Sequence, residues 1–166
     1  WRPSAIDIAP VYGGKLVSVD SPEADAMPGV KRVVRLEEAV AVVADTYWHA
    51  RKALAALEPT FDDAGHGNVS SASIFAAFDG ALGEAPVMPQ EAAKVVTADY
   101  RVPFLAHATM EPMVCTARVD GERAEIWAGV QDPLNARAMA ADALEWDVEQ
   151  IQLPNLPLGG GFGRRL

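Results

Sequence analysis

Short apolar segments with two different periods follow one another along the first half of this chain. Some alternate apolar with polar residues, as a half-buried strand does, and others repeat apolar residues three or four positions apart, as a helix does. The predicted strands are 15–20, 30–36 and 38–44, the last of them apolar enough to be buried on both faces. The predicted helices are 21–26, which starts at Ser21-Pro22, and a longer one that is capped by Asp45 and ends before Pro59. Strands and helices mixed in this order predict an α+β fold.

The second half begins with a predicted loop over 61–71 and a helix from about Ser71, where Ser70, Ser71 and Ser73 are interpreted as caps. Gly83 and the segment 86–89 end that helix, so we place a boundary near residue 90 and expect two domains, 1–90 and 91–166. The second domain is predicted to hold strands at 94–102, 113–119, 122–130 and 148–153, a hairpin turn at Asp120-Gly121, and a helix from Asp132-Pro133 to about Trp146.

The charge and hydropathy of the chain exclude two kinds of partner. The net charge is −9, with 14 Lys and Arg scattered among 23 Asp and Glu, so we expect no nucleic-acid surface. No apolar run approaches the ~20 residues that cross a bilayer, so we expect no transmembrane segment in this chain.

Metal-ligating residue types are few and scattered. Cys115 is the single cysteine, which excludes an internal disulfide, an iron–sulfur cluster and a cysteine-based zinc site held by this chain alone. It lies in an apolar predicted strand, so we expect a buried thiol. His49, His66 and His107 are far apart and show no ligand spacing, so we assign no metal ligand among them and expect surface or locally bonded side chains.

The run Gly159-Gly160-Gly161-Phe162-Gly163 is the strongest candidate for a binding site. Without Cβ atoms, the backbone N–H groups of such a run can approach a polar or anionic ligand closely. The run does not fit a dinucleotide fingerprint, because Arg164 stands where the third glycine is needed, and no P-loop lysine is present. Since the sequence ends three residues after the last glycine, we expect a piece of a longer protein in which this loop is loose.

Two polar residues lie at turns beside predicted strands. Glu111 precedes Pro112 between two strands, and we interpret it as a structural acid held by backbone donors. Gln131 ends a predicted strand just before the helix start at Asp132-Pro133, where a rigid scaffold positions ligand contacts.

Three motifs occur in a fixed order: Ala-His-Ala-Thr-Met-Glu-Pro at 106–112, Trp-Ala-Gly-Val-Gln at 127–131, and Gly-Gly-Gly-Phe-Gly-Arg-Arg at 159–165. Together they resemble the molybdopterin-binding large subunit of the xanthine oxidase family of molybdenum hydroxylases, and the last is similar to the isoquinoline 1-oxidoreductase β-subunit type. Segments 14–20, 26–30 and 41–48 resemble the α/β hammerhead domain of that family. The resemblance therefore implies a hammerhead-like domain followed by the opening βαβ part of a molybdenum-cofactor-binding domain.

This resemblance implies an oxidoreductase that hydroxylates an aldehyde or N-heteroaromatic small molecule with oxygen derived from water. It implies a molybdopterin-type molybdenum cofactor in the cytosine dinucleotide form, and iron–sulfur clusters in a small partner subunit that accept the electrons. The implied cofactor contacts are Gln131, which would lie near an oxo ligand of molybdenum, and Gly159, Gly160, Gly161, Phe162, Gly163 and Arg164. No side chain of this chain is expected to ligate the metal.

The family's general-base glutamate matches no position here, so we expect the isolated chain to be inactive and assign it no catalytic residue. Leu166 stands where xanthine-type members carry a glutamate, which argues against a purine substrate. The resemblance to the isoquinoline type implies a bacterial protein. Its location is either the periplasm, after export by the twin-arginine route, or the cytoplasm. Two alternatives to the enzyme hypothesis are a non-catalytic module for subunit interfaces and a stand-alone binder of small ligands.

Overall fold

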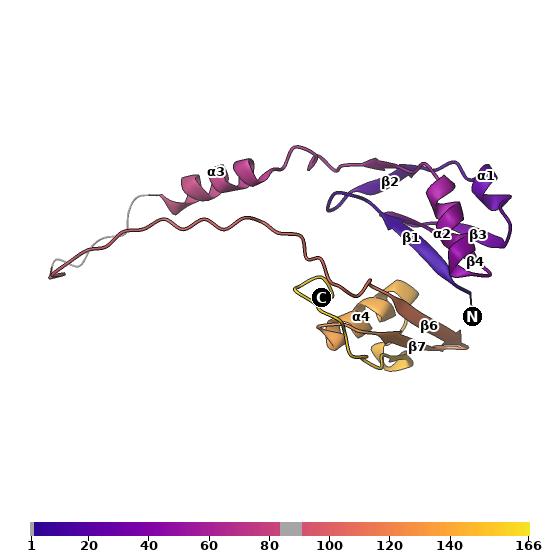
Figure 1. Ribbon diagram of the computed structural model, residues 1–166. Coiled ribbons are helices and arrows are strands. Elements are labelled where there is room, and N and C mark those ends of the chain that lie inside the picture. Colours follow the sequence, from indigo (N-terminus) through magenta and orange to yellow (C-terminus); the bar gives the residue numbers. More distant parts are fainter. Residues whose placement is uncertain (1, 84–90) are drawn as a thin grey trace. The chain divides into compact units, whose positions relative to one another are not determined.

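The computed structural model describes residues 2–83 and 91–166, which form a mixed α/β structure (Figure 1). The chain divides into two compact units, Trp1–Thr97 and Ala98–Leu166, and each is described by itself. Among the described residues, no helix combines the length and the apolar character needed to cross a membrane.

The first unit contains a three-stranded antiparallel sheet in the order β1–β4–β3. Its strands are β1 (Ser4–Ile8), β3 (Val30–Arg35) and β4 (Ala39–Ala44), and a separate pair joins β2 (Lys15–Ser18) to β5 (Thr60–Asp62). Its helices are α1 (Pro22–Asp25), α2 (Tyr47–Ala56) and α3 (Ser71–Leu82). The predicted strands 15–20, 30–36 and 38–44 thus correspond to β2, β3 and β4.

Two strands of this unit were not predicted. β1 pairs with β4, with Ser4 opposite Val43, and β5 lies at the start of the predicted loop 61–71. Both are short, and both form through partners far away along the chain. The local pattern of residues therefore carries little signal for either strand.

The helix starts predicted from local signals are confirmed at α1 and α3. At α3, Ser70 Oγ accepts a hydrogen bond from Ser73 N–H (3.2 Å) and Ser73 Oγ accepts one from Ser70 N–H (2.9 Å), which is a capping box. At α2 the predicted cap is wrong, because Thr46 Oγ1 accepts the hydrogen bond from His49 N–H (3.2 Å). Asp45 still belongs to the end of the sheet, since its N–H donates to the Gly29 carbonyl (2.9 Å).

The second unit contains a hairpin followed by a βαβ unit. Its elements are β6 (Cys115–Asp120), β7 (Arg123–Ala128), α4 (Pro133–Leu144) and β8 (Ile151–Gln152). β6 and β7 pair antiparallel across the predicted Asp120-Gly121 turn, and β8 returns parallel to β7. Asp132 caps α4 as predicted, because its Oδ1 accepts a hydrogen bond from Asn135 N–H (3.0 Å).

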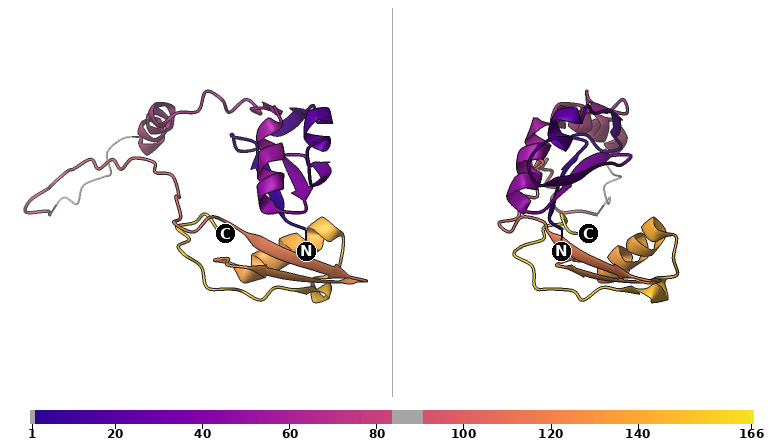
Figure 2. Two further views of the ribbon diagram at one scale, coloured as in Figure 1. Left: turned by 45° about the vertical axis from the view of Figure 1, so that its right-hand side comes forward. Right: turned by 90° about the vertical axis from the view of Figure 1, so that its right-hand side faces the viewer.

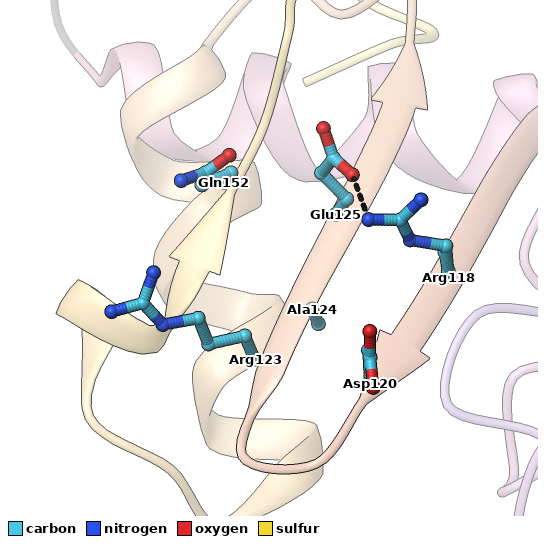
Figure 3. A pocket seen from close by; sticks show the side chains of 6 residues that line it. All are labelled: Arg118, Asp120, Arg123, Ala124, Glu125 and Gln152. Carbon is cyan, nitrogen blue, oxygen red and sulfur yellow. Dashed lines mark ion pairs between the residues drawn. The ribbon is translucent and has the colours of Figure 1, made fainter.

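α4 covers one face of this sheet, where Ala124, Ala141 and Ile151 form a small buried core (Figure 2). The opposite face is polar, and Figure 3 shows the charged side chains of β6 and β7 beside Gln152 of β8. There Arg118 forms an ion pair with Glu125 at 3.3 Å. One face of the sheet is therefore apolar and the other charged, as expected for strands whose side chains alternate between two faces.

Three expectations for the second half are wrong. The segment 94–102 forms no strand and has no ladder partner among the described residues. The predicted strand 148–153 is strand only over Ile151–Gln152, because Val148–Gln150 forms a short 3₁₀ helix. Cys115 is exposed rather than buried, since α4 packs over β7 and β8 and leaves the edge strand β6 open.

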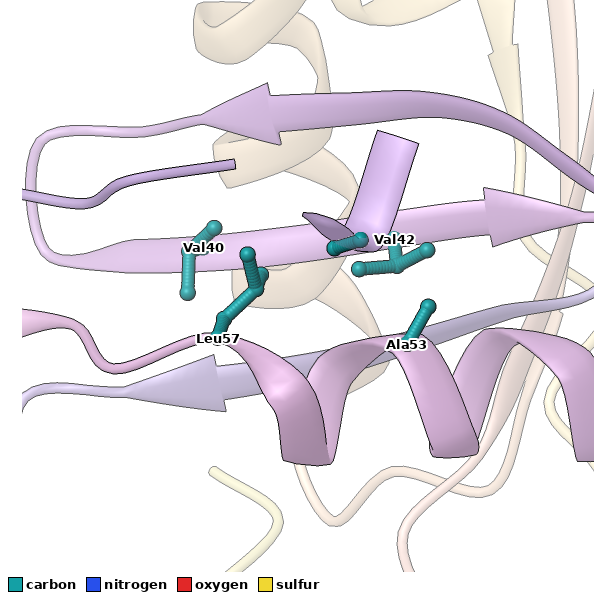
Figure 4. Close-up of a cluster of buried hydrophobic side chains, with 5 residues drawn as sticks. Val40, Val42, Ala53 and Leu57 are labelled. Atoms are coloured by element: carbon teal, nitrogen blue, oxygen red, sulfur yellow. The ribbon is translucent and has the colours of Figure 1, made fainter. Parts of the chain in front are cut away.

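The core of the first unit lies between β4 and α2. Val40 and Val42 are completely buried and point toward Ala53 and Leu57, as Figure 4 shows. Burial on both faces of β4 was predicted, but the face turned away from α2 is only partly covered, with Val43 half-buried. The central place of β4 in the sheet explains why its residues are almost all apolar.

Candidate functional site

The glycine loop, defined here as residues 159–165, lies beside the segment that leads into β6 (Figure 1). The chain reaches it from β8 by running along the end of β7. Asn155 Oδ1 accepts a hydrogen bond from Val130 N–H (3.0 Å), and Asn155 Nδ2 donates to the Val130 carbonyl (3.2 Å). Leu156 N–H also donates to the Ala128 carbonyl (2.9 Å). The sheet therefore determines where the loop begins.

Gln131 holds the second half of the loop through its side-chain carbonyl. Its Oε1 accepts hydrogen bonds from Gly163 N–H (2.9 Å) and Arg165 N–H (3.3 Å), and its own N–H donates to the Arg165 carbonyl (2.8 Å). A Cβ atom at Gly161 would lie 2.5 Å from this oxygen. Only glycine at that position leaves room for the Gln131 side chain.

Glu111 holds the first residue of the loop. Its Oε2 accepts a hydrogen bond from Gly159 N–H (2.6 Å) and forms an ion pair with Arg165 Nη2 (2.9 Å). Arg165 is 5% exposed, and its guanidinium also donates to the carbonyls of Glu111 (2.8 Å) and Gly129 (3.3 Å). The interpretation of Glu111 as an acid held by backbone donors is confirmed.

These contacts correct the expectation that the loop is loose. The backbone donors of Gly159, Gly163 and Arg165 are all held by the side chains of Glu111 and Gln131. The reason is that anchoring comes from residues 32 and 48 positions earlier in the sequence, and not from an element that follows the loop.

The middle of the loop is the part with free backbone donors. Within residues 2–83 and 91–166, no acceptor receives the N–H groups of Gly160, Gly161 or Phe162, nor the amide Nε2 of Gln131. The backbone is left-handed at Gly160 (φ +100°) and Phe162 (φ +54°), so successive N–H groups can turn toward one side. The Phe162 ring is 71% exposed next to them. Such an arrangement can bind a polar or anionic group against an aromatic side chain.

The structure brings the seven predicted contacts together, because Gln131 bonds the loop that contains the other six, Gly159, Gly160, Gly161, Phe162, Gly163 and Arg164. Arg164 has an exposed side chain, and its N–H donates to the Gly161 carbonyl (2.8 Å). Sequence reasoning missed the role of Arg165. Two adjacent arginines carry no sequence signal for which one is buried.

The second unit contains two cavities. One of about 280 Å³ includes loop residues and is lined by Met113, Val114, Cys115, Ala128, Gly129, Val130, Arg164, Arg165 and Leu166. The other, of about 250 Å³, is the polar cavity of Figure 3 and includes no residue of the glycine loop. In the described part of the chain, no three His, Cys, Asp or Glu side chains gather as a metal site would need.

Comparison with known proteins identifies the second half of the chain. Residues 66–166 match the molybdopterin cofactor-binding domain family. The aldehyde oxidoreductase molybdenum-binding subunit PaoC of Escherichia coli O157:H7 is 33% identical over 89 residues, which cover 54% of this chain and 11% of that protein.

Solved structures share the fold at low sequence identity. An aldehyde oxidoreductase from Desulfovibrio gigas superposes with a TM-score of 0.68 at 18% identity, over 99% of this chain and 24% of its own. The quinoline 2-oxidoreductase of Pseudomonas putida 86 superposes with a TM-score of 0.65 at 17% identity, over 99% of this chain and 28% of its own. This chain therefore spans about a quarter of the length of these proteins.

Proposed function

Because this chain belongs to the molybdopterin cofactor-binding domain family, we propose that it forms one wall of the cofactor site in a molybdenum-dependent oxidoreductase. The full subunit would hydroxylate an aldehyde or an N-heteroaromatic compound with oxygen from water. The electrons removed from the substrate would pass to iron–sulfur clusters in a small partner subunit. The aldehyde and quinoline oxidoreductases among the similar proteins support both substrate classes.

The observation that carries this proposal is the group of three consecutive backbone N–H donors at Gly160, Gly161 and Phe162. None of them donates to an acceptor in the described residues, whereas the loop on either side is held by Glu111 and Gln131. Donors fixed in direction and left unpaired suit a ligand rich in oxygen atoms. The residues present therefore fit a molybdopterin-type cofactor, which supplies the two-electron redox chemistry that protein side chains lack.

Gln131 has a second task in this proposal. Since its Oε1 already accepts from Gly163 and Arg165, the orientation of the amide is fixed and Nε2 remains as a donor. We propose that Nε2 donates to an acceptor on the cofactor, and that the exposed Phe162 ring and Arg164 side chain border the same ligand. Gly159 and Gly163 would act by keeping the backbone close to it.

The finer assignments are part of the same proposal. Arg164, Arg165 and Leu166 support the isoquinoline 1-oxidoreductase β-subunit type, and we propose the cytosine dinucleotide form of the cofactor. We propose a hammerhead-like domain over 1–90 and the opening part of a molybdopterin-binding domain over 91–166. The isolated chain would be inactive, because the general-base glutamate of the family has no matched position among its residues.

An interaction module remains the second candidate, and one observation favours it. Apolar residues are exposed along segment 96–105, which precedes β6 in the sequence. They include Val96 (77%), Tyr100 (89%) and Leu105 (76%). An exposed apolar run of this kind is typical of a surface that another chain or domain covers. Capture of a stable heteromer by a full subunit that contains no molybdenum would favour this function over the enzyme.

Molybdenum content of the full-length subunit, purified with its partner, tests the main proposal. We expect elemental analysis to find the metal in the wild type. In Gln131→Glu the acceptor for Gly163 N–H is kept while the Nε2 donor is lost, so we expect about tenfold weaker cofactor retention, the equivalent of one hydrogen bond.

Gln152→Glu is the matched control for this experiment. Gln152 lies on β8 at the polar cavity of Figure 3, outside the glycine loop, and the same chemical change there should leave molybdenum content unchanged. A wild-type complex without molybdenum would contradict the proposal.

A further inference from the structure

We propose that Glu111 and Arg165 are a positioning pair that sets the shape of the glycine loop. Neither residue is among the predicted cofactor contacts, and both act through the backbone that they hold. The consequence for the cofactor rests on the function proposed above, whereas the consequence for the loop does not.

The first line of argument is the burial of Arg165. Its side chain is only 3% exposed, and a charged group so deeply buried requires compensation by an opposite charge and by hydrogen-bond acceptors. Glu111 supplies the carboxylate at 2.9 Å and a carbonyl at 2.8 Å, and Gly129 supplies a second carbonyl at 3.3 Å. Arg165 is thus fixed at the end of β7, where Gly129 follows the strand.

The second line is that one carboxylate oxygen contacts both ends of the loop. Glu111 Oε2 accepts from Gly159 N–H (2.6 Å), at the first residue, and pairs with Arg165 Nη2 (2.9 Å), at the last. One carboxylate oxygen therefore ties the backbone of the first loop residue to the side chain of the last. Gln131 then holds Gly163, between them.

The third line is that the loop's backbone needs external support. Gly160, Phe162 and Gly163 all have positive φ, and Phe162 is not a glycine, so its left-handed conformation costs free energy. Such a conformation persists only where the surroundings hold it. With the ends held, the N–H groups of Gly160, Gly161 and Phe162 keep one direction.

A second arginine–glutamate pair in the same unit provides the contrast. Arg118 and Glu125 lie 3.3 Å apart on neighbouring strands, with side chains 62% and 29% exposed, and neither contacts the glycine loop. That pair lies on the polar face shown in Figure 3. Removing it is the matched control for removing the buried pair.

The experiment is hydrogen exchange in the full-length subunit, measured after removal of the cofactor. Arg165→Met should speed exchange of the Gly159 and Gly163 amides by about tenfold or more, because local opening then costs less free energy. The Gly159 amide is the decisive one, because its N–H donates to Glu111 and not to Arg165. Faster exchange there in Arg165→Met would show that Arg165 acts through Glu111. Glu111→Gln should give the same pattern, and amides of the β6–β7 hairpin should keep their rates.

Rescue separates positioning from general stability. Arg165→Lys keeps the charge but not the planar fork, so it should restore only part of the loop's protection. It also serves, with Glu111→Gln, as the test if Arg165→Met does not fold. Arg118→Met should leave the loop amides unchanged.

Two results would overturn the proposal. One is unchanged exchange at Gly159 in Arg165→Met and Glu111→Gln. The other is equal acceleration in the loop and in the hairpin, which would make Arg165 a residue of general stability only. Molybdenum content, measured separately, reports on the proposed function, so failure of one is distinguishable from failure of the other.

Discussion

At Gly161 the absence of a side chain decides where Gln131 can lie. An added Cβ would come within 2.5 Å of both Oε1 and Cδ of Gln131, so the two positions are sterically coupled although 30 residues separate them. The φ angle of Gly161 is not in the left-handed region, unlike that of Gly160 or Gly163. A substitution at Gly161 would therefore test the space that the missing side chain leaves for Gln131, and not the backbone conformation.

Gly161→Ala is expected to displace Gln131 and to break its hydrogen bonds from Gly163 and Arg165. Two backbone donors would lose their acceptor, which should lower the free energy of unfolding by about 1–3 kcal/mol, together with molybdenum content. Chemical denaturation and elemental analysis of the full-length subunit measure the two effects.

Gly80→Ala provides the control, because a Cβ at Gly80 meets no atom within 4 Å and the residue lies in α3. Alanine should leave molybdenum content unchanged and raise helix stability by up to about 1 kcal/mol. Equal losses in the two variants would refute the steric argument for Gly161.

Among the elements, the junction between β4 and α2 contains a side-chain pair of Asp45 and His49. Asp45 Oδ1 contacts His49 Nδ1 at 2.5 Å, while Thr46 caps the helix. The hydrogen bond from His49 holds the pKa of the Asp45 carboxyl below its usual range. Both side chains are substantially exposed, so salt weakens the contact.

This lowered pKa makes the junction sensitive to acid. The folded state binds the Asp45 proton less readily than the unfolded state, so the contribution to stability is complete above the ordinary aspartate pKa of about 3.9 and is lost as pH falls through the lowered value. The difference in Tm between wild type and Asp45→Asn should therefore shrink as the pH falls below about 4.

His49→Ala removes the same contact from the other side and should show the same acid dependence. In the double variant the two losses should not add, because they report one interaction. Additive losses, or a Tm difference that persists in acid, would contradict the assignment.

For the molecule as a whole, several large apolar residues are exposed along one segment of the described chain. Val96, Tyr100 and Val102 occupy even-numbered positions of the alternating segment 94–102 and are 77%, 89% and 77% exposed. The alternation predicted a strand, but none of the sheets in the described residues includes this segment.

The solvent exposure of Tyr100 reports whether another part of the protein covers this segment. In the isolated chain, oxidative footprinting should label it heavily, whereas in the full-length subunit most of the labelling should disappear as the apolar segment is covered. Denatured protein provides the reference for complete labelling. Equal labelling in both folded forms would show that this surface stays open.

Local signals carried much of the secondary structure. The residues Ser21-Pro22, Ser70 and Asp132-Pro133 predicted helix starts, because cap residues and first-turn prolines act within one turn. The turn at Asp120-Gly121 predicted the β6–β7 hairpin for the same reason. β1 and β5 were missed, because each depends on a partner strand chosen by the tertiary fold. At α2 the adjacent Asp45 and Thr46 are both residue types that cap helices, and Thr46 is the one that does so.

By itself, the sequence determined which residue types are available to the site and where the helices and the hairpin begin. Only the tertiary structure decided that Glu111 and Gln131 hold a glycine loop 48 and 32 residues away, and that Arg165 is buried while Arg164 is exposed. The physical reason is the distance along the chain over which each interaction acts. Caps and turns act within a few residues, whereas hydrogen bonds and ion pairs between distant segments exist only after packing has brought them together.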